Sequence, residues 1–166
     1  FESIQGKGTK FILHISFEIS AEEQEKKSHM YQNCSVEGIQ VLLVEDNELN
    51  MEIAEFLLKE EKMIVTKAWN GREAAELFKQ SGLREYDAVL MDIMMPELDG
   101  KEASRKIRSM ADQRQDAAKI PILAMTAQAS TESIHQCKSA GMNECIFKPV
   151  NAKELIRLLQ DIVAKI

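Results

Sequence analysis

The sequence predicts an α/β domain in which a parallel sheet is covered by helices on both faces. From Ile39 onward, five short apolar runs alternate with five stretches of helical character, and short connections join them. Repeated βα units of this kind form parallel sheets with right-handed crossovers. Most of the runs are continuously apolar, which is typical of strands that are buried on both faces.

The expected strands are, in chain order, residues 39–44, 63–68, 86–92, 120–125 and 144–147. The second run, MIVTKA, mixes polar with apolar residues, which favours a position at the edge of the sheet. The first helix places Leu49, Ile53, Phe56 and Leu57 on one face. The next three helices span about 72–80, 100–110 and 131–140, and their inward residues include Ala74, Leu77, Phe78, Ala103 and Ile107. The last helix has Leu155, Leu158, Leu159 and Ile162 at helical spacing.

The first 38 residues differ from the rest of the chain. Residues 10–19 alternate between apolar and polar side chains, which predicts one strand, and GKGT at 6–9 predicts the turn before it. Residues 20–38 are polar and charged without a clear period, which indicates a linker. The expected organisation is therefore an arm at 1–19, a linker at 20–38 and the βα domain at 39–166. The lack of an initiator Met and of a signal peptide suggests a fragment of a longer protein.

Composition excludes several classes of function. The 166 residues carry a net charge of −6, which argues against nucleic acid and anionic membranes as partners. No stretch is long and apolar enough to span a bilayer, so we expect a cytoplasmic fragment without direct membrane contact. The three cysteines, Cys34, Cys137 and Cys145, are widely spaced and predict reduced thiols rather than a disulfide or zinc framework.

Polar residues stand at the ends of four of the expected strands. Glu45 and Asp46 follow the first, Asp92 ends the third, Thr126 follows the fourth and Lys148 follows the fifth. In open α/β sheets, ligands bind beyond the carboxyl ends of the strands, so these side chains should converge. Carboxylates suit Mg²⁺, and an ammonium and a hydroxyl suit phosphoryl oxygens. The set predicts a magnesium site with Asp92 as phosphoacceptor.

A backbone carbonyl just after Asp92, at Met94, is a further candidate metal ligand. Each site residue alone also has an ordinary structural explanation. A Glu-Asp-Asn run often caps the following helix, Thr126 is suited to a helix start, and Lys148 before Pro149 is suited to a solvated position. Their coincidence at four strand ends of one domain favours the functional interpretation.

The segments VLLVEDNELN, LMDIMMPELDG, ILAMTAQA and CIFKPV closely resemble the receiver domain of two-component response regulators, over residues 39–166. The resemblance implies a flavodoxin-like three-layer fold with strand order 2-1-3-4-5. It also implies Mg²⁺-dependent phosphoryl transfer from a histidine kinase to Asp92, and a cis bond between Lys148 and Pro149.

FESIQGKGTKFILHISFEI resembles the last glycine motif and closing strand of a histidine-kinase ATPase domain, which implies a hybrid sensor histidine kinase. A bare strand arm is the alternative. None of His14, His29 and His135 matches the family's phosphodonor pattern. An unpaired strand edge also leads to the hypothesis of a homodimer formed through this arm.

The sequence departs from the family pattern at Cys145, where many receivers carry the Tyr or Phe that turns inward on phosphorylation. Met94 and Gln128 occupy the places that tune hydrolysis of the acyl phosphate in the family. The lifetime of the acyl phosphate is not predictable from these residues, and we expect Cys145 to be a small apolar core residue rather than a redox group.

We interpret the chain as a phosphorelay receiver that accepts a phosphoryl group on Asp92. It then passes the group to a histidine phosphotransfer partner or loses it to water, so enzyme status stays undecided for this fragment. Because no DNA-binding domain follows residue 166, we expect output through a partner or the parent chain. A flavin mononucleotide module and an aspartyl phosphatase are rivals, but the latter would need an acid at Met94. A pseudo-receiver that only binds proteins is the third alternative.

Overall fold

The computed structural model describes residues 2–4, 8–10, 35–127 and 130–163. The chain divides into two compact units, Phe1–Gln32 and Asn33–Ile166. In the first unit, β1 (Glu2–Ile4) pairs antiparallel with β2 (Gly8–Lys10). The last two residues of the predicted GKGT turn are therefore part of a strand, because they pair with β1. The rest of the predicted 10–19 strand, and the linker as far as residue 34, lie outside the described residues.

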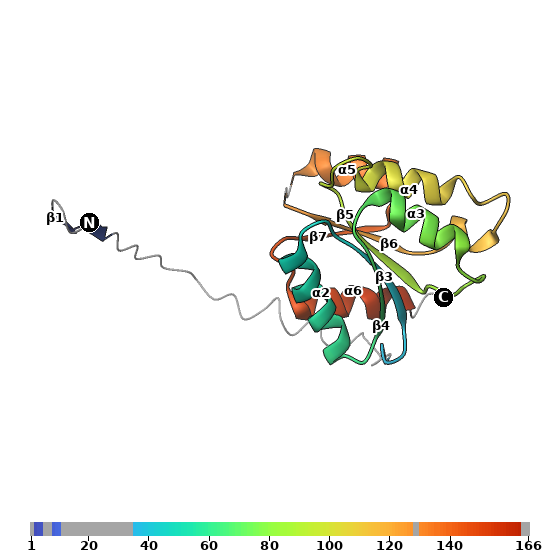
Figure 1. The fold of residues 1–166 in the computed structure, drawn as a ribbon, viewed down its shortest axis with the longest axis horizontal. Coiled ribbons are helices and arrows are strands. Elements are labelled where there is room, and N and C mark those ends of the chain that lie inside the picture. The colour runs from blue at the N-terminus through green and yellow to red at the C-terminus, as the bar shows by residue number, and fades with distance from the viewer. Residues whose placement is uncertain (1, 5–7, 11–34, 128–129, 164–166) are drawn as a thin grey trace, which may run out of the picture. The chain divides into compact units, whose positions relative to one another are not determined.

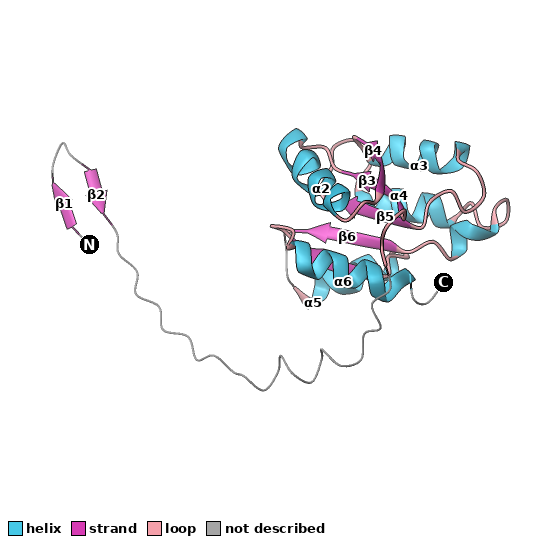
Figure 2. Ribbon diagram, turned by 90° about the horizontal axis from the view of Figure 1, so that it is seen from below, coloured by secondary structure: helices cyan, strands magenta, loops and turns pink. Residues whose placement is uncertain are grey.

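The second unit contains a sheet of five parallel strands (Figures 1 and 2). They are β3 (Gln40–Val44), β4 (Ile64–Ala68), β5 (Ala88–Asp92), β6 (Ile122–Thr126) and β7 (Glu144–Phe147). Their order is β4-β3-β5-β6-β7, so the predicted order 2-1-3-4-5 and the edge position of the second strand are confirmed. The strands are short and fully buried at the centre, and all of β5 and β6 is buried.

Five α-helices connect the strands and cover the sheet. They are α2 (Glu48–Glu60), α3 (Gly71–Gln80), α4 (Gly100–Arg108), α5 (Thr131–Ser139) and α6 (Ala152–Val163). The first four begin at polar capping residues whose side chains accept a hydrogen bond from a backbone N–H of the first turn: Asn47, Asn70, Asp99 and Ser130. Within the described residues, no helix combines the length and the apolar character that crossing a membrane requires.

Two hydrophobic cores lie on opposite faces of the sheet. Helices α2 and α6 pack on one face, where Leu58 and Leu155 join Val41 and Leu43 of β3. Helices α3, α4 and α5 pack on the other face, as Figure 1 shows, around the fully buried Phe78. Successive strand residues alternate between the two cores, which is how a continuously apolar strand buries both of its faces. Val36, just before β3, is also buried in the first of these cores.

The apolar face predicted for the first helix is not the face that packs on the sheet. Leu49, Ile53 and Phe56 are 64%, 48% and 61% exposed, whereas Met51 and Leu58 are fully buried. Both sets have helical spacing, because α2 carries two apolar stripes. Periodicity alone cannot choose between such stripes; the direction in which the chain leaves β3 decides which one meets the sheet. An exposed apolar face therefore remains on α2.

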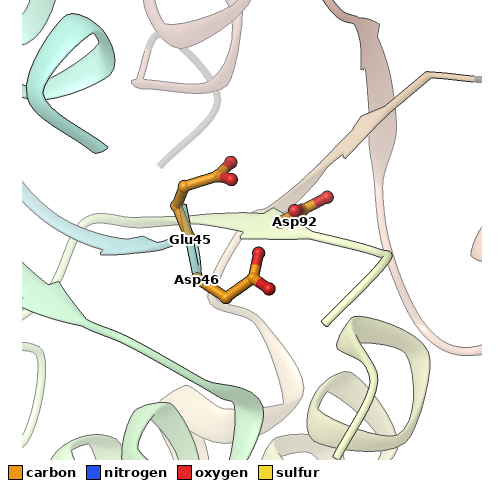
Figure 3. Close-up of side chains that lie close together, drawn as sticks. All are labelled: Glu45, Asp46 and Asp92. Atoms are coloured by element: carbon orange, nitrogen blue, oxygen red, sulfur yellow. The ribbon is translucent and has the colours of Figure 1, made fainter. Parts of the chain in front are cut away.

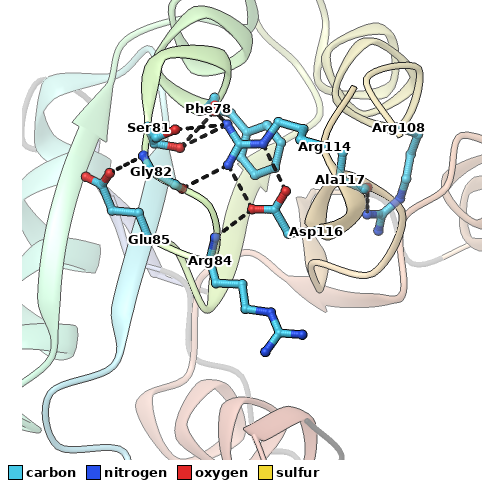
Figure 4. Close-up of polar contacts among 9 residues, drawn as sticks. All are labelled: Phe78, Ser81, Gly82, Arg84, Glu85, Arg108, Arg114, Asp116 and Ala117. Carbon is cyan, nitrogen blue, oxygen red and sulfur yellow. Dashed lines mark hydrogen bonds and ion pairs between the residues drawn. The ribbon is translucent and has the colours of Figure 1, made fainter. Parts of the chain in front are cut away.

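The segment ADQRQDAAK at 111–119, which lies between the expected helix at 100–110 and the expected strand at 120–125 and is predicted only as a polar loop, is anchored by Arg114 (Figure 4). Its guanidinium lies 4.2 Å from the centre of the Phe78 ring and pairs with Asp116 at 2.8 Å. It also donates hydrogen bonds to the carbonyl oxygens of Phe78 and Gly82, at the end of α3. The Asp116 carboxylate accepts the backbone N–H of Arg84, and pairing with Arg114 lowers its pKa to about 2. A short 3-10 helix, Gln115–Ala118, begins directly after Arg114 and contains Asp116.

Candidate functional site

Three carboxylates meet beyond the carboxyl ends of β3 and β5, as the sequence predicts. Glu45 and Asp46 directly follow β3, and Asp92 is the last residue of β5. Figure 3 shows the three side chains turned toward a common space. One carboxylate oxygen from each lies within 4.8 Å of the others. Because Mg²⁺ binds oxygen ligands, usually one or two carboxylates completed by water, this donor set fits that ion.

Lys148 joins two of these carboxylates. Its ammonium lies 2.6 Å from Oε2 of Glu45 and 2.9 Å from Oδ2 of Asp92. Glu45 and Asp92 are only 1% and 4% exposed, so both charges are nearly removed from water. A single ammonium therefore partly neutralises two buried carboxylates, and the site as a whole keeps an excess of negative charge.

Burial and the neighbouring charges shift the pKa values of Asp92 and Lys148. Burial raises the pKa of Asp92, and the Glu45 carboxylate adds to the rise, while Lys148 partly offsets it. Burial opposes the charged form of Lys148, but its bonds to Glu45 and Asp92 outweigh that effect and raise its pKa. The ammonium is thus firmly protonated, and Asp92 is more costly to ionise than an exposed aspartate.

Two residues that follow Asp92 in the chain, Met94 and Gly100, pack close to it and contribute to its position. The backbone N–H of Met94 donates to Oδ1 of Asp92 at 3.2 Å. Gly100, the first residue of α4, donates its N–H to the carbonyl of Ile93 and lies so close that a Cβ atom there would overlap the carbonyl oxygen of Asp92. Gly100 was not among the predicted site residues, although the capping residue Asp99 before it marks the helix start. The Met94 side chain is 74% exposed, and its carbonyl stays a predicted ligand.

Thr126 and Lys148 are held next to each other by the sheet. Thr126 ends β6, is 4% exposed and lies opposite Phe147 in the ladder. Its carbonyl accepts the backbone N–H of Lys148 at 2.8 Å. The Lys148–Pro149 peptide bond is cis, which confirms the expectation from the family resemblance.

Asn50 is a further residue at the site that the sequence analysis missed. Its side-chain Nδ2 donates to Oε1 of Glu45 at 3.0 Å. A groove of about 100 Å³ runs from Glu45 and Asn50 past Ile53 of α2 to Lys148 and Val150. The exposed apolar face of α2 therefore reaches the edge of the carboxylate cluster. The signal in the sequence was the spacing Glu45-x₄-Asn50, which brings the first helical turn back over the strand end.

Among the described residues, Cys137, Cys145 and His135 do not contribute to the site, and His14 and His29 lie outside that part of the chain. Cys145 lies in β7 and packs against the core that contains Cys137. Burial, together with the neighbouring Cys137 thiol, raises the pKa of Cys145 to about 12, so its thiol is unreactive. His135 is exposed on α5, while Gln128 and Cys34 lie outside the described residues.

Comparison with known proteins agrees with this geometry. The family model described as the response regulator receiver domain matches residues 41–160. "Probable histidine kinase 1" of Oryza sativa subsp. indica is 32% identical over 166 residues, and "Hybrid signal transduction histidine kinase L" of Dictyostelium discoideum is 34% identical over 141. These alignments cover 82% and 85% of this chain. The chain spans only 17% and 8% of the length of those two relatives.

Two solved structures are similar in fold and sequence. The receiver domain of a sensor histidine kinase from Pseudomonas aeruginosa, with a magnesium ion coordinated in its active site cleft, is 36% identical with a TM-score of 0.68. The match covers 76% of this chain and 98% of that one. A receiver domain from Saccharomyces cerevisiae, co-crystallised with a histidine phosphotransfer signalling protein, is 32% identical with a TM-score of 0.68. That match covers 75% of this chain and 88% of the yeast chain.

Proposed function

The chain belongs to the response regulator receiver domain family, and from this we propose that it accepts a phosphoryl group from a histidine kinase onto Asp92 in a Mg²⁺-dependent reaction. The observation that carries the proposal is the Lys148 ammonium, which lies between Glu45 and Asp92 beside a third carboxylate. An ammonium and three carboxylates at one strand edge suit an incoming phosphoryl group together with a divalent cation.

The transfer is a substitution at phosphorus. A carboxylate oxygen of Asp92 forms a P–O bond as the P–N bond of the donor phosphohistidine breaks, which gives an acyl phosphate and a free imidazole. Glu45, Asp46, Asp92 and the carbonyl of Met94 would hold Mg²⁺, which when bound offsets the charge on the phosphoryl oxygens. The protein's own residues position the groups: Met94 N–H fixes one oxygen of Asp92, and burial excludes water from the carboxylate.

After transfer, Lys148 and Thr126 would hold the phosphoryl oxygens. Lys148 already lies 2.9 Å from Asp92, so its ammonium needs only a small movement to reach a group attached there. The Thr126 hydroxyl comes from the end of the adjacent strand β6. Cys145 stands at the place that an aromatic residue takes in many receivers, so a response to the phosphoryl group would not include the turning of an aromatic ring at that position.

We further propose that the partner is a protein that presents a histidine, either a kinase or a histidine phosphotransfer domain. Such a partner must cover the groups around Asp92 while its imidazole approaches. The exposed side chains of Leu49, Ile53 and Phe56 form an apolar face on the helix next to the site, and Ile53 lines the groove that leads to Lys148. The yeast receiver co-crystallised with a phosphotransfer protein supports this class of partner.

The kinase relatives support the proposal that the parent chain is a hybrid histidine kinase and that the chain's first residues come from its ATPase domain. The homodimer formed through the N-terminal strand stays a prediction. Gel filtration of the chain over a hundredfold range of concentration would test it, and a constant monomeric elution volume would contradict it.

The deciding experiment is intact mass after incubation with acetyl phosphate, with and without Mg²⁺. We expect one added phosphoryl group that requires both Mg²⁺ and Asp92, and no adduct on Asp92→Asn. Asp112→Asn is the matched control, because Asp112 is exposed and its side chain makes no hydrogen bond or ion pair among the described residues. No adduct in any condition, and no binding of beryllofluoride, would contradict the proposal and favour the alternative of a pseudo-receiver, a module that only binds proteins.

A further inference from the structure

Both oxygens of the Glu45 carboxylate are occupied by protein donors. Oε2 accepts from the Lys148 ammonium at 2.6 Å. Oε1 accepts from Nδ2 of Asn50 at 3.0 Å and from the backbone N–H of Asn47 at 3.4 Å. Because the Glu45 side chain is buried from water, these three donors define its orientation.

Asn50 is suited to this contact by its place in the first turn of α2. Its backbone N–H is already bound by the capping side chain of Asn47 at 3.0 Å, so the position of Asn50 relative to the strand end is fixed. The side-chain amide then reaches back to Glu45, two residues before the cap. The arrangement is similar to a capping box, except that the returning side chain binds a carboxylate instead of a backbone N–H.

We propose that Asn50 is a positioning residue that keeps Glu45 as the resting partner of Lys148, and that it thereby raises the affinity of the site for Mg²⁺. The inference rests on the proposed function, since it concerns the same carboxylate cluster. It adds a residue outside the carboxylates, the hydroxyl and the ammonium described above.

The Lys148 ammonium and a bound cation compete for the Asp92 carboxylate. Lys148 is shared between Glu45 and Asp92, and a cation that binds Asp92 must compete with the ammonium for that carboxylate. When Asn50 fixes Glu45, the Lys148 ammonium keeps the Glu45 carboxylate as an acceptor at 2.6 Å and can release Asp92 to the cation. When Glu45 loses the hydrogen bond from Asn50, the ammonium binds Asp92 more closely and repels a cation at that carboxylate.

The chemistry of the contact requires a donor at position 50. Replacement of Asn50 by Asp keeps the shape of the side chain but sets a second acceptor about 3 Å from Oε1 of Glu45, where two carboxylates would repel. Replacement by Gln keeps the donor on a longer arm. The series Asn50→Ala, Asn50→Asp and Asn50→Gln therefore separates the hydrogen bond from the volume of the side chain.

The test is a titration with Mg²⁺ followed by tryptophan fluorescence. Trp69 is the only tryptophan, and it follows Ala68, whose carbonyl accepts the backbone N–H of Glu45 at 3.2 Å. If the ring does not respond, the same constants follow from the dependence of the urea midpoint on Mg²⁺ concentration. We expect the Kd for Mg²⁺ to rise about 10-fold in Asn50→Ala, as is typical when a group that orients a metal ligand is lost.

Asn50→Asp should raise the Kd at least as much as Asn50→Ala does, and Asn50→Gln should recover part of the affinity. Glu52→Ala is the matched control, since Glu52 is an exposed residue of the same helix with no contact to the site among the described residues. A purely structural role would lower stability in all three Asn50 variants without the partial recovery of Mg²⁺ affinity.

A double-mutant cycle decides whether Asn50 acts through Glu45. In a Glu45→Gln background, Asn50→Ala should change the Kd by less than about twofold, because no carboxylate remains to be oriented. A Kd for Asn50→Ala within twofold of the wild type, or an unchanged effect in the Glu45→Gln background, would overturn the inference. Neither readout needs phosphorylation, so a chain that binds Mg²⁺ as expected yet takes no phosphoryl group would reject only the proposed function.

Discussion

Replacing the phosphoacceptor should make the fold more stable. In Mg²⁺-free buffer at pH 7.5, we expect Asp92→Asn to raise the free energy of unfolding by about 1–2 kcal/mol, the size that relief of a strained functional site commonly gives. The reason is that Asp92 is a nearly buried carboxylate whose pKa is raised by burial and by Glu45. An amide of the same shape keeps the packing and removes the charge.

The magnitude follows from opposing terms. At an effective dielectric constant of about 20, Glu45 and Asp92 oxygens within 4.8 Å of each other repel by about 3.5 kcal/mol or more, and the 2.9 Å contact with Lys148 attracts by about 5.7 kcal/mol. Removing the charge therefore loses about 2 kcal/mol of net attraction or less. It also removes the cost of burying an ion, several kcal/mol, and Lys148 keeps Glu45 as a partner. The balance favours the variant by a small amount.

The pH dependence has a definite sign. A carboxyl group with a raised folded-state pKa binds its proton more tightly in the folded chain than in the unfolded chain. Wild-type stability should therefore fall as pH rises from the ordinary aspartate value of about 3.9 through the raised pKa of Asp92. The advantage of Asp92→Asn should be absent at pH 3 and should grow as pH rises through the raised pKa of Asp92. Added Mg²⁺ should reduce the difference in free energy of unfolding between Asp92→Asn and the wild type, because it stabilises the wild type.

The assay is urea unfolding followed by circular dichroism, in EDTA and in Mg²⁺, at several pH values. Asp112→Asn is again the matched control and should be neutral within about 0.5 kcal/mol, as expected for an exposed position. If Asp92→Asn is less stable than the wild type by 1 kcal/mol or more in EDTA at pH 7.5, the ion pair with Lys148 outweighs burial and the reasoning is wrong.

Three further predictions concern the scaffold. Arg114→Ala should cost about 2 kcal/mol in urea unfolding because it leaves the partly buried Asp116 without its guanidinium partner, and the cost should shrink as pH falls through about 2, the pKa of that carboxyl; an undiminished cost at pH 2 would contradict the pairing. Gly100→Ala should cost about 1–3 kcal/mol, because its Cβ would overlap a carbonyl oxygen of β5, and an unchanged urea midpoint would show that α4 shifts freely. Cys145 should alkylate more than 100-fold more slowly in the folded chain than in urea at pH 8, since partial burial raises its pKa to about 12, with peptide mass spectrometry as the readout; equal rates would refute the raised pKa.

The strand ends were predictable because two independent signals coincide there. Each central strand is a continuous apolar run, and each run stops at a polar residue that the sheet then carries to a common edge. Asp92, Thr126 and Lys148 follow directly from that rule, and the family resemblance supplied the strand order. The register that sets Thr126 opposite Phe147 is a consequence of the sheet, and no local pattern in the sequence encodes it.

The misjudged elements depend on contacts between distant segments. The outward face of α2 was not predictable, because Met51 and Leu58 offer the sheet a second stripe that is as regular as Ile53 and Phe56. The anchor at Arg114 was missed for a similar reason: its partners include the carbonyl of Phe78, 36 residues away. A charged residue in a polar segment gives no sign that it will bind such a partner.

Lys148 connects the chemistry of the site to the surface beside it. Its bond to Glu45 joins the end of β7 to the end of β3, across the two intervening strands of the sheet. The Lys148 ammonium lies within hydrogen-bond distance of both Glu45 and Asp92. A phosphoryl group on Asp92 would therefore compete with Glu45 for this ammonium. Glu45 and Lys148 line the same groove as Ile53 and Val150. The exchange of partners at Lys148 would therefore alter the wall of that groove, so a protein docked on α2 would meet different surfaces before and after phosphorylation.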